Sequence, residues 1–228
     1  MNGILYGVSV GPGDPELLTL KAVKTIQACP VIATPQTTGE KTLALDIAAG
    51  AVDLRGKELL TLPFLMTRDH QKLRKSHRAG ADAIAAHLRS GRDVAMLNLG
   101  DVSVYSSFSY LMELLQTDGF EVRMIPGVPS FCAVAAELGV SLTTMHKPIH
   151  VFPASSGPTG EVLTLPGTKI LMKTGKAMPE VRAAIEEAGL GEKAMLVQNC
   201  GLPGQKVCRT LDEASDGISY FTTIIIKE

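Results

Sequence analysis

The sequence has no tryptophan and few other aromatic residues, with four tyrosines and six phenylalanines among its 228 residues. It also has no excess of one charge, because 22 Lys plus Arg stand against 23 Asp plus Glu. A balanced charge gives no electrostatic attraction to nucleic acid or to an acidic membrane surface, so neither is expected as a partner. A chain of this length can form one large or two modest domains, each with a buried core.

Long apolar runs and closely paired cysteines are also missing. No window approaches the ~20 apolar residues of a membrane span. The first residues, MNGILYGVSVGPGD, carry glycines where a signal peptide needs an unbroken apolar stretch. Four cysteines are scattered without a C-x-x-C pair, at Cys29, Cys132, Cys200 and Cys208. This spacing is typical of reduced thiols that serve as small buried hydrophobes, and we expect a cytoplasmic protein.

Apolar runs rich in β-branched residues alternate with amphipathic stretches, which predicts an α/β protein with a largely parallel sheet. The expected strands cover 4–10, 30–33, 58–63, 93–97, 122–125, 150–153, 168–173, 193–198 and 220–226. The expected helices cover 15–26, 41–49, 69–90, 106–116, 129–138 and 179–188. The composition of 155–160 indicates a flexible loop.

The alternation of strands and helices changes between residues 117 and 125, after which strands dominate. We therefore expect two α/β domains. The first would cover 1–120 with a mainly parallel sheet, and the second would cover 121–228 with a mixed sheet.

The segment Gly7 to Ala22, GVSVGPGDPELLTLKA, reads as a strand, a glycine turn and a helix. Glycines allow a ligand to approach the backbone, and the helix start offers free amide groups. Asp14 can equally be only the N-cap of that helix. The spacing differs from the G-x-G-x-x-G fingerprint, and a proline stands between Gly11 and Gly13, so a dinucleotide site is not indicated.

Two further turns follow strands in the same way. One contains Gly100 and Asp101 and leads to Tyr105, and the other runs from Pro126 to Ser130. Ligands of open parallel sheets bind at the carboxyl ends of the strands. Each turn alone is common, but three at that edge predict one shared cleft.

In combination, these motifs resemble the tetrapyrrole methylase family, which uses S-adenosylmethionine. They are GPGD-x-x-LLT-x-KA, GD-x-x-x-YSS and PGV-x-S-F-x-A-x-AA, in this order. The resemblance implies two α/β domains, a cleft between them and a homodimer. YGVSVGPGDPELLTLKA, LPFLMTRD and YSSFSYLMELL are most similar to precorrin-2 and cobalt-factor II C20-methyltransferases of cobalamin biosynthesis. Val102 stands where the family usually has proline, and Pro129 replaces a usual Ser or Thr.

The resemblance also assigns candidate site residues. It implies that S-adenosylmethionine is bound by Pro12, Leu99, Gly100, Asp101, Val104, Pro129, Ser130, Met172, Asn199 and Cys200, with Thr222 and Thr223 as weaker candidates. Tyr105 and Asp101 would lie beside the transferred methyl group and are the candidate catalytic residues, with His146 as another candidate base. The carboxylates of a tetrapyrrole could pair with Arg68, Lys72, Arg74 or Lys147, although each also fits a solvated surface.

A resident metal is not expected. His146 and His150 have helical spacing, but Pro148 between them argues against a helix. The segment Lys173 to Lys176, KTGK, is not a phosphate-binding loop, because the preceding glycine is too far away and Ala177 stands where Ser or Thr is needed. Two alternatives remain open: a family member that methylates another tetrapyrrole carbon, uroporphyrinogen or a different substrate such as RNA or diphthine, and a non-catalytic nucleotide-binding module.

Overall fold

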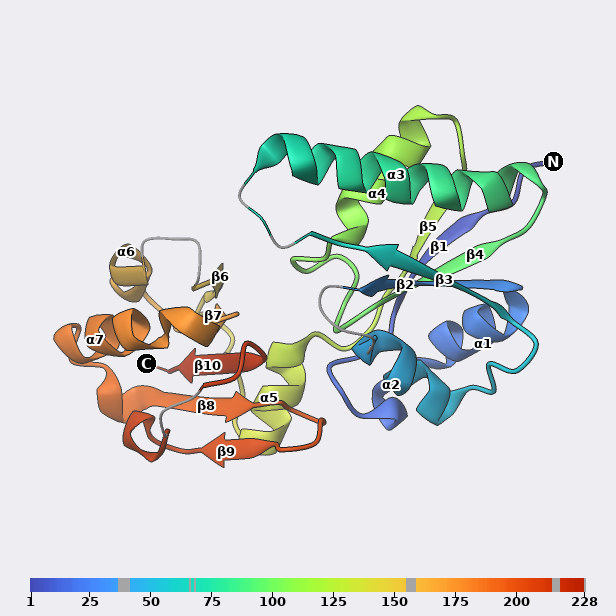
Figure 1. Ribbon diagram of the computed structural model, residues 1–228. Coiled ribbons are helices and arrows are strands. Elements are labelled where there is room, and N and C mark those ends of the chain that lie inside the picture. The colour runs from blue at the N-terminus through green and yellow to red at the C-terminus, as the bar shows by residue number, and fades with distance from the viewer. Residues whose placement is uncertain (37–41, 66, 68, 155–158, 215–217, 228) are drawn as a thin grey trace. The chain divides into compact units, whose positions relative to one another are not determined.

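A computed structural model describes residues 1–36, 42–65, 67, 69–154, 159–214 and 218–227. Its contacts divide the chain into two units, Met1–Val128 and Pro129–Glu228, each built of a sheet and helices (Figure 1). The expected α/β class with two domains is confirmed. The division falls later than the expected boundary at 120/121, because the strand at 122–125 hydrogen-bonds to the first strand of the chain.

The first unit contains a five-stranded sheet in the order β3-β2-β4-β1-β5. Its strands are β1 (Leu5–Ser9), β2 (Val31–Gln36), β3 (Glu58–Pro63), β4 (Val94–Asn98) and β5 (Val122–Ile125). All their pairings are parallel. Every residue of β4 is buried, as expected for a strand covered on both faces. Because β1 lies between β4 and β5, the turns that follow these three strands are neighbours.

Four α-helices cover this sheet: α1 (Leu20–Ala28), α2 (Leu43–Ala51), α3 (His70–Arg89) and α4 (Phe108–Thr117). Figure 1 shows α3 and α4 on one face and α1 and α2 on the other. Phe108 of α4 packs over β1 so closely that a Cβ added at Gly7 would lie 2.4 Å from its ring. Aromatic and aliphatic side chains of α3 and α4 form the core of this face.

The single helix expected over 15–26 is wrong. Pro15–Leu17 forms only a 3-10 turn, and Asp14 caps it by accepting a hydrogen bond from Glu16 N at 2.9 Å. Thr19 then caps α1 through a 3.1 Å bond from Ala22 N. Two caps in succession divide the segment because each holds its residue in an extended conformation.

The second unit contains a five-stranded sheet in the order β6-β7-β10-β8-β9, in which only the β6–β7 pairing is parallel. Its elements are α5 (Ser130–Leu138), β6 (Ile149–Pro153), α6 (Thr159–Leu163), β7 (Thr168–Met172), α7 (Met178–Glu187), β8 (Ala194–Gln198), β9 (Lys206–Cys208) and β10 (Thr222–Ile226). The short elements α6 and β9 were not expected from the sequence. Among the residues described, no helix combines the length and apolarity needed to cross a membrane.

Candidate functional site

The turns after β4 and β1 are joined by backbone hydrogen bonds. Gly100 N donates to Gly11 O at 2.7 Å, and Gly11 N donates to Gly100 O at 3.2 Å. Both glycines have positive φ angles, 75° at Gly11 and 72° at Gly100, which other residues adopt only with strain. Pro12, Leu99 and Gly100 are thereby brought together at the carboxyl edge of the first sheet.

Asp101 joins the turn after β4 to the turn after β5. Its Oδ2 accepts a 2.7 Å hydrogen bond from Gly127 N, while its Oδ1 accepts bonds from the backbone and the hydroxyl of Ser103. The residue is 8% exposed. Both carboxylate oxygens are therefore engaged by protein donors, and the side chain fixes the relative position of two strand-end turns.

The electrostatic state of Asp101 follows from these contacts. Burial alone would raise its pKa, but hydrogen bonds from Ser103, Gly127 and Ser9 outweigh burial and hold the pKa below the ordinary value. The carboxylate is thus ionised at neutral pH. A carboxylate with a lowered pKa is a weak proton acceptor, which favours a positioning role over that of a general base.

Gly127 is required by the close approach of these turns. A Cβ added there would lie 2.4 Å from Ser9 Cβ and 3.1 Å from Gly100 O. Neither neighbour is the end of a flexible side chain. The glycine of the P-G-V motif therefore allows the turn after β5 to pack directly against β1 and the turn after β4.

The loop from β4 to α4 is held by side chains of the strand ends. Val102 N donates to Ser9 Oγ at 2.8 Å, a bond that proline at this position could not make. Ser106 Oγ donates to the buried Asn98 Oδ1 at 2.9 Å. Tyr105 lies in this loop, has a φ of 49° and is 43% exposed. Val104 N donates to Asp101 O at 3.2 Å, so the loop turns back directly after Asp101, and Tyr105 follows in this turn.

In the second unit, the ends of β7 and β8 and the start of β10 share one edge of the sheet. Met172 is the register partner of Thr223, and Thr222 is the partner of Gln198. Ser130, the first residue of α5 after its N-cap Pro129, places its Oγ 3.5 Å from Thr223 Oγ1. This edge therefore brings together the Met172 thioether, the hydroxyls of Ser130 and Thr223 and the start of a helix, while the buried Thr222 hydroxyl donates to Ser219 O at 2.7 Å.

Asn199 and Cys200 follow β8 at the same edge. Asn199 has a φ of 50°, and its Oδ1 accepts a 2.6 Å bond from Ser219 Oγ. Cys200 is buried, and burial is the main reason that the pKa of its thiol rises to about 11. The thiol is therefore protonated at neutral pH and unsuited to nucleophilic chemistry.

The candidate residues thus fall into two groups, each within one unit. The edge of the first sheet carries Pro12, Leu99, Gly100, Asp101, Val104 and Tyr105, and the edge of the second carries Pro129, Ser130, Met172, Asn199, Cys200 and Thr222. The sequence did not reveal the structural roles of Ser9 and Gly127. Ser9 accepts a hydrogen bond from Val102 N, and Gly127 N donates one to Asp101. The sequence signal for Gly127 was its place directly after Pro126, where the strand 122–125 has just ended.

Of the expected carboxylate-binding cations, Lys72, Arg74 and Lys147 are exposed. Lys72 Nζ lies 3.8 Å from Asp69 in an exposed ion pair, and Arg68 lies outside the described residues.

The His77 ring stacks on the Tyr110 ring with centroids 4.5 Å apart, and burial lowers the pKa of the His77 imidazole. The described residues contain no group of three or more His, Cys, Asp or Glu side chains placed to hold a metal ion.

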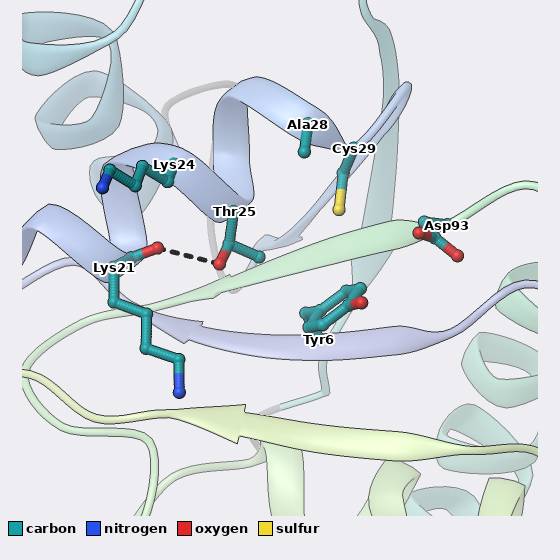
Figure 2. A pocket seen from close by; sticks show the side chains of 7 residues that line it. All are labelled: Tyr6, Lys21, Lys24, Thr25, Ala28, Cys29 and Asp93. Atoms are coloured by element: carbon teal, nitrogen blue, oxygen red, sulfur yellow. Dashed lines mark hydrogen bonds between the residues drawn. The ribbon is translucent and has the colours of Figure 1, made fainter.

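A cavity of about 200 Å³ lies beside α1, toward the amino ends of β1 and β4. Figure 2 shows its lining residues, Tyr6, Lys21, Lys24, Thr25, Ala28, Cys29 and Asp93. Burial, with Asp93 nearby, raises the pKa of the Cys29 thiol to about 12. None of the candidate site residues lines this cavity, and its thiol is unreactive at neutral pH.

Two curated proteins that are similar to this chain along its whole length are named methyltransferases. The cobalt-precorrin-2 C(20)-methyltransferase of Salmonella typhimurium is 29% identical over 236 aligned positions, which cover 100% of this chain and 98% of that protein. The precorrin-2 C(20)-methyltransferase of a Sinorhizobium species is also 29% identical, with 98% and 95% of the two chains covered.

Solved structures show the same fold. The X-ray structure of a cobalt precorrin-4 methyltransferase has a TM-score of 0.78 at 23% identity and covers 98% of this chain and 94% of its own. Uroporphyrin-III C-methyltransferase from Thermus thermophilus, complexed with S-adenosylhomocysteine, has a TM-score of 0.70 at 21% identity, with 99% and 92% covered. The model of the tetrapyrrole (corrin/porphyrin) methylases matches residues 4–215. The expected resemblance is confirmed: the chain belongs to the tetrapyrrole methylase family and is a methyltransferase.

Proposed function

We propose that the protein transfers a methyl group from S-adenosylmethionine to C20 of precorrin-2 or cobalt-factor II, a step in cobalamin biosynthesis. The observation that carries this proposal is similarity over the whole chain to two proteins that both bear the C(20)-methyltransferase name. One is named for the cobalt-containing substrate and the other for the metal-free one, so both forms belong to the proposal.

The candidate residues fit S-adenosylmethionine chemically. The cofactor offers a carboxylate, an ammonium, ribose hydroxyls and a flat adenine, and it supplies a methyl group on a positively charged sulfur. Glycine turns at the first edge lack side chains that would keep a ligand from the backbone, although the amides and carbonyls of Gly11 and Gly100 already bond each other. Met172 is half-buried and can pack against a flat base, and the half-buried Ser130 hydroxyl can exchange hydrogen bonds. Thr222 is buried, and its hydroxyl already donates to Ser219 O at 2.7 Å.

The proposed cofactor residues are those of both edges. They are Pro12, Leu99, Gly100, Asp101 and Val104, together with Pro129, Ser130, Met172, Asn199, Cys200 and Thr222. Asp101 acts in this proposal mainly by positioning the turns, because its oxygens already accept hydrogen bonds from Ser103 and Gly127.

Methyl transfer from a sulfonium ion requires orientation and exclusion of water rather than a nucleophilic side chain. The carbon attacks the methyl group, the methyl–sulfur bond breaks, and the carbon later loses a proton. Tyr105 and Asp101 are the proposed catalytic residues, because Tyr105 is partly exposed in the loop that follows Asp101. The proton leaves to water, since the Asp101 carboxylate has a lowered pKa and a phenol already carries its own proton.

Calorimetry with S-adenosylhomocysteine tests the cofactor assignment. Wild-type protein should bind it, and Met172→Ala should weaken binding roughly tenfold by removing packing on the adenine. Met195→Ala is the matched control, because Met195 lies within β8 and pairs with Ile225 away from the edge. Absence of binding to folded wild-type protein would contradict the proposal.

The homodimer and the cytoplasmic location stay predictions. An apolar surface shared by two copies would form an isologous interface. Light scattering of the purified protein at several concentrations measures the assembly directly.

A further inference from the structure

Two buried polar side chains end neighbouring strands of the first sheet. Ser9 is the last residue of β1 and Asn98 is the last residue of β4, and the parallel pairing makes them register partners. Register partners point to the same face of a sheet, so these two side chains lie side by side. Both residues are buried. Polar groups at such positions need hydrogen-bond partners, because burial without one costs free energy.

Both side chains bond the loop that connects β4 to α4. Ser9 Oγ accepts the 2.8 Å hydrogen bond from Val102 N, near the start of the loop. Asn98 Oδ1 accepts the 2.9 Å bond from Ser106 Oγ, near its end. The two strand ends therefore anchor the loop at two points.

Tyr105 lies between these two anchored positions in a strained backbone conformation. Its φ is 49°, a left-handed value that costs free energy in a tyrosine. Such a conformation persists only where the surrounding contacts determine it. The bonds of Val102 and Ser106 to the strand ends are contacts of this kind, because they fix the chain before and after Tyr105.

The bond between Val102 and Ser9 is shielded from water. Val102 is 3% exposed and is the second residue of a four-residue turn, which Val104 N closes by donating to Asp101 O at 3.2 Å. A buried amide that loses its acceptor costs more free energy than the bond itself contributes. Without Ser9 Oγ, the turn must shift to bring the Val102 amide to another acceptor, and Val104 must move with it.

We propose that Ser9 and Asn98 are positioning residues for methyl transfer, which hold the loop after β4 in the conformation that binds S-adenosylmethionine. The inference rests on the proposed function, in which Val104 contacts the cofactor and Tyr105 lies beside the transferred methyl group. Ser9 and Asn98 touch no reactant and act through the loop. The Ser9 hydroxyl also hydrogen-bonds the Asp101 carboxylate and helps to hold its pKa low, so one side chain supports two parts of this edge.

Replacements on both sides of the bond between Ser9 and Val102 test the proposal. Ser9→Gly removes the acceptor and leaves the buried Val102 amide without it. Val102→Pro removes the amide hydrogen, and proline is favoured at the second position of such a turn. With Ser9 present, however, the proline ring carbon on the nitrogen would take the place of that hydrogen and collide with Ser9 Oγ. The double variant Ser9→Gly/Val102→Pro has neither the unpaired amide nor the collision.

Calorimetry with S-adenosylhomocysteine measures the effect on the loop. Each single replacement should weaken binding roughly tenfold, because the loop populates the binding conformation less. The double variant should recover to within about threefold of wild type. It should still unfold more easily than wild type, since glycine within a strand costs free energy. A recovered affinity without recovered stability distinguishes positioning of the loop from a general effect on the fold.

Two further variants complete the test. Ser106→Ala removes the bond to Asn98 from a half-buried position, so it perturbs the core least and should weaken binding roughly threefold to tenfold. Ile26→Val is the control, because Ile26 is buried in α1 on the other face of the sheet (Figure 1). It should lower stability and leave the affinity unchanged. Circular dichroism confirms that each variant is folded.

Affinities of Ser9→Gly and Ser106→Ala within roughly twofold of wild type would overturn the positioning role alone. A double variant that binds no more tightly than either single variant would do the same. Wild-type protein that does not bind S-adenosylhomocysteine would overturn the proposed function, and this inference with it.

Discussion

Replacing Asp101 should destabilise the first unit, because this side chain holds two strand-end turns together. Its carboxylate accepts hydrogen bonds from Ser103 N at 2.9 Å and from Gly127 N at 2.7 Å. Hydrogen bonds to a charged group contribute about 1.5–3 kcal/mol each, and the contributions are not additive. We therefore expect Asp101→Ala to lower the free energy of unfolding by about 3 kcal/mol.

Asp101→Asn should cost less, about 2 kcal/mol, because the amide keeps the shape and one acceptor but turns an NH₂ group toward a donor. Urea unfolding followed by circular dichroism measures both values. Asp118→Asn is the matched control, since Asp118 pairs with Arg78 in a partly exposed ion pair, and such pairs contribute at most about 1 kcal/mol.

The effect of Asp101 should also depend on pH in a defined direction. Its folded-state pKa is lowered, so its stabilisation is complete above the unfolded pKa of about 3.9 and is lost as the pH falls through the folded value. The difference between wild type and Asp101→Asn should therefore shrink in acid. A difference below about 0.5 kcal/mol at neutral pH, or one that does not shrink in acid, would refute the positioning role.

Three further substitutions test other parts of the account, each by urea unfolding. Gly127→Ala should lower the free energy of unfolding by about 1–3 kcal/mol, because its Cβ would lie 2.4 Å from Ser9 Cβ. An unchanged free energy of unfolding would contradict the close approach of the turns. Thr19→Ala should cost about 1 kcal/mol by uncapping α1, and no loss would mean that the cap is unimportant. Lys57→Met should cost about 0.3–1 kcal/mol, because Nζ donates to the carbonyls of Gln27 and Cys29 at the end of α1; unchanged stability would exclude that role.

Much of the fold could be predicted because hydrophobic periodicity and turn residues record local structure. The strands at 58–63 and 122–125 have the expected bounds. The sequence did not predict which of the two sheets the strand 122–125 joins, because its pairing with β1 joins residues that are distant in sequence. The single helix expected from Pro15 is wrong for a local reason: Thr19 is extended and caps a new helix, α1.

The geometry of the candidate site could be predicted from the sequence less fully than the fold. The motifs placed Gly100 and Asp101 at a strand end, but the part played by the Asp101 carboxylate depends on the turn after β5. That contact exists only because β1 lies between β4 and β5. The backbone conformation of Lys173 is likewise invisible in the sequence, since lysine rarely adopts a positive φ.

Carbon-13 NMR of the reaction product tests the central claim most directly. The protein is incubated with cobalt-factor II, and in a parallel sample with precorrin-2, together with S-adenosylmethionine labelled in its methyl group. We predict one labelled methyl group on C20 in at least one of the two products. A labelled methyl on another carbon, or no labelled product from protein that binds S-adenosylhomocysteine, would contradict C20 methylation.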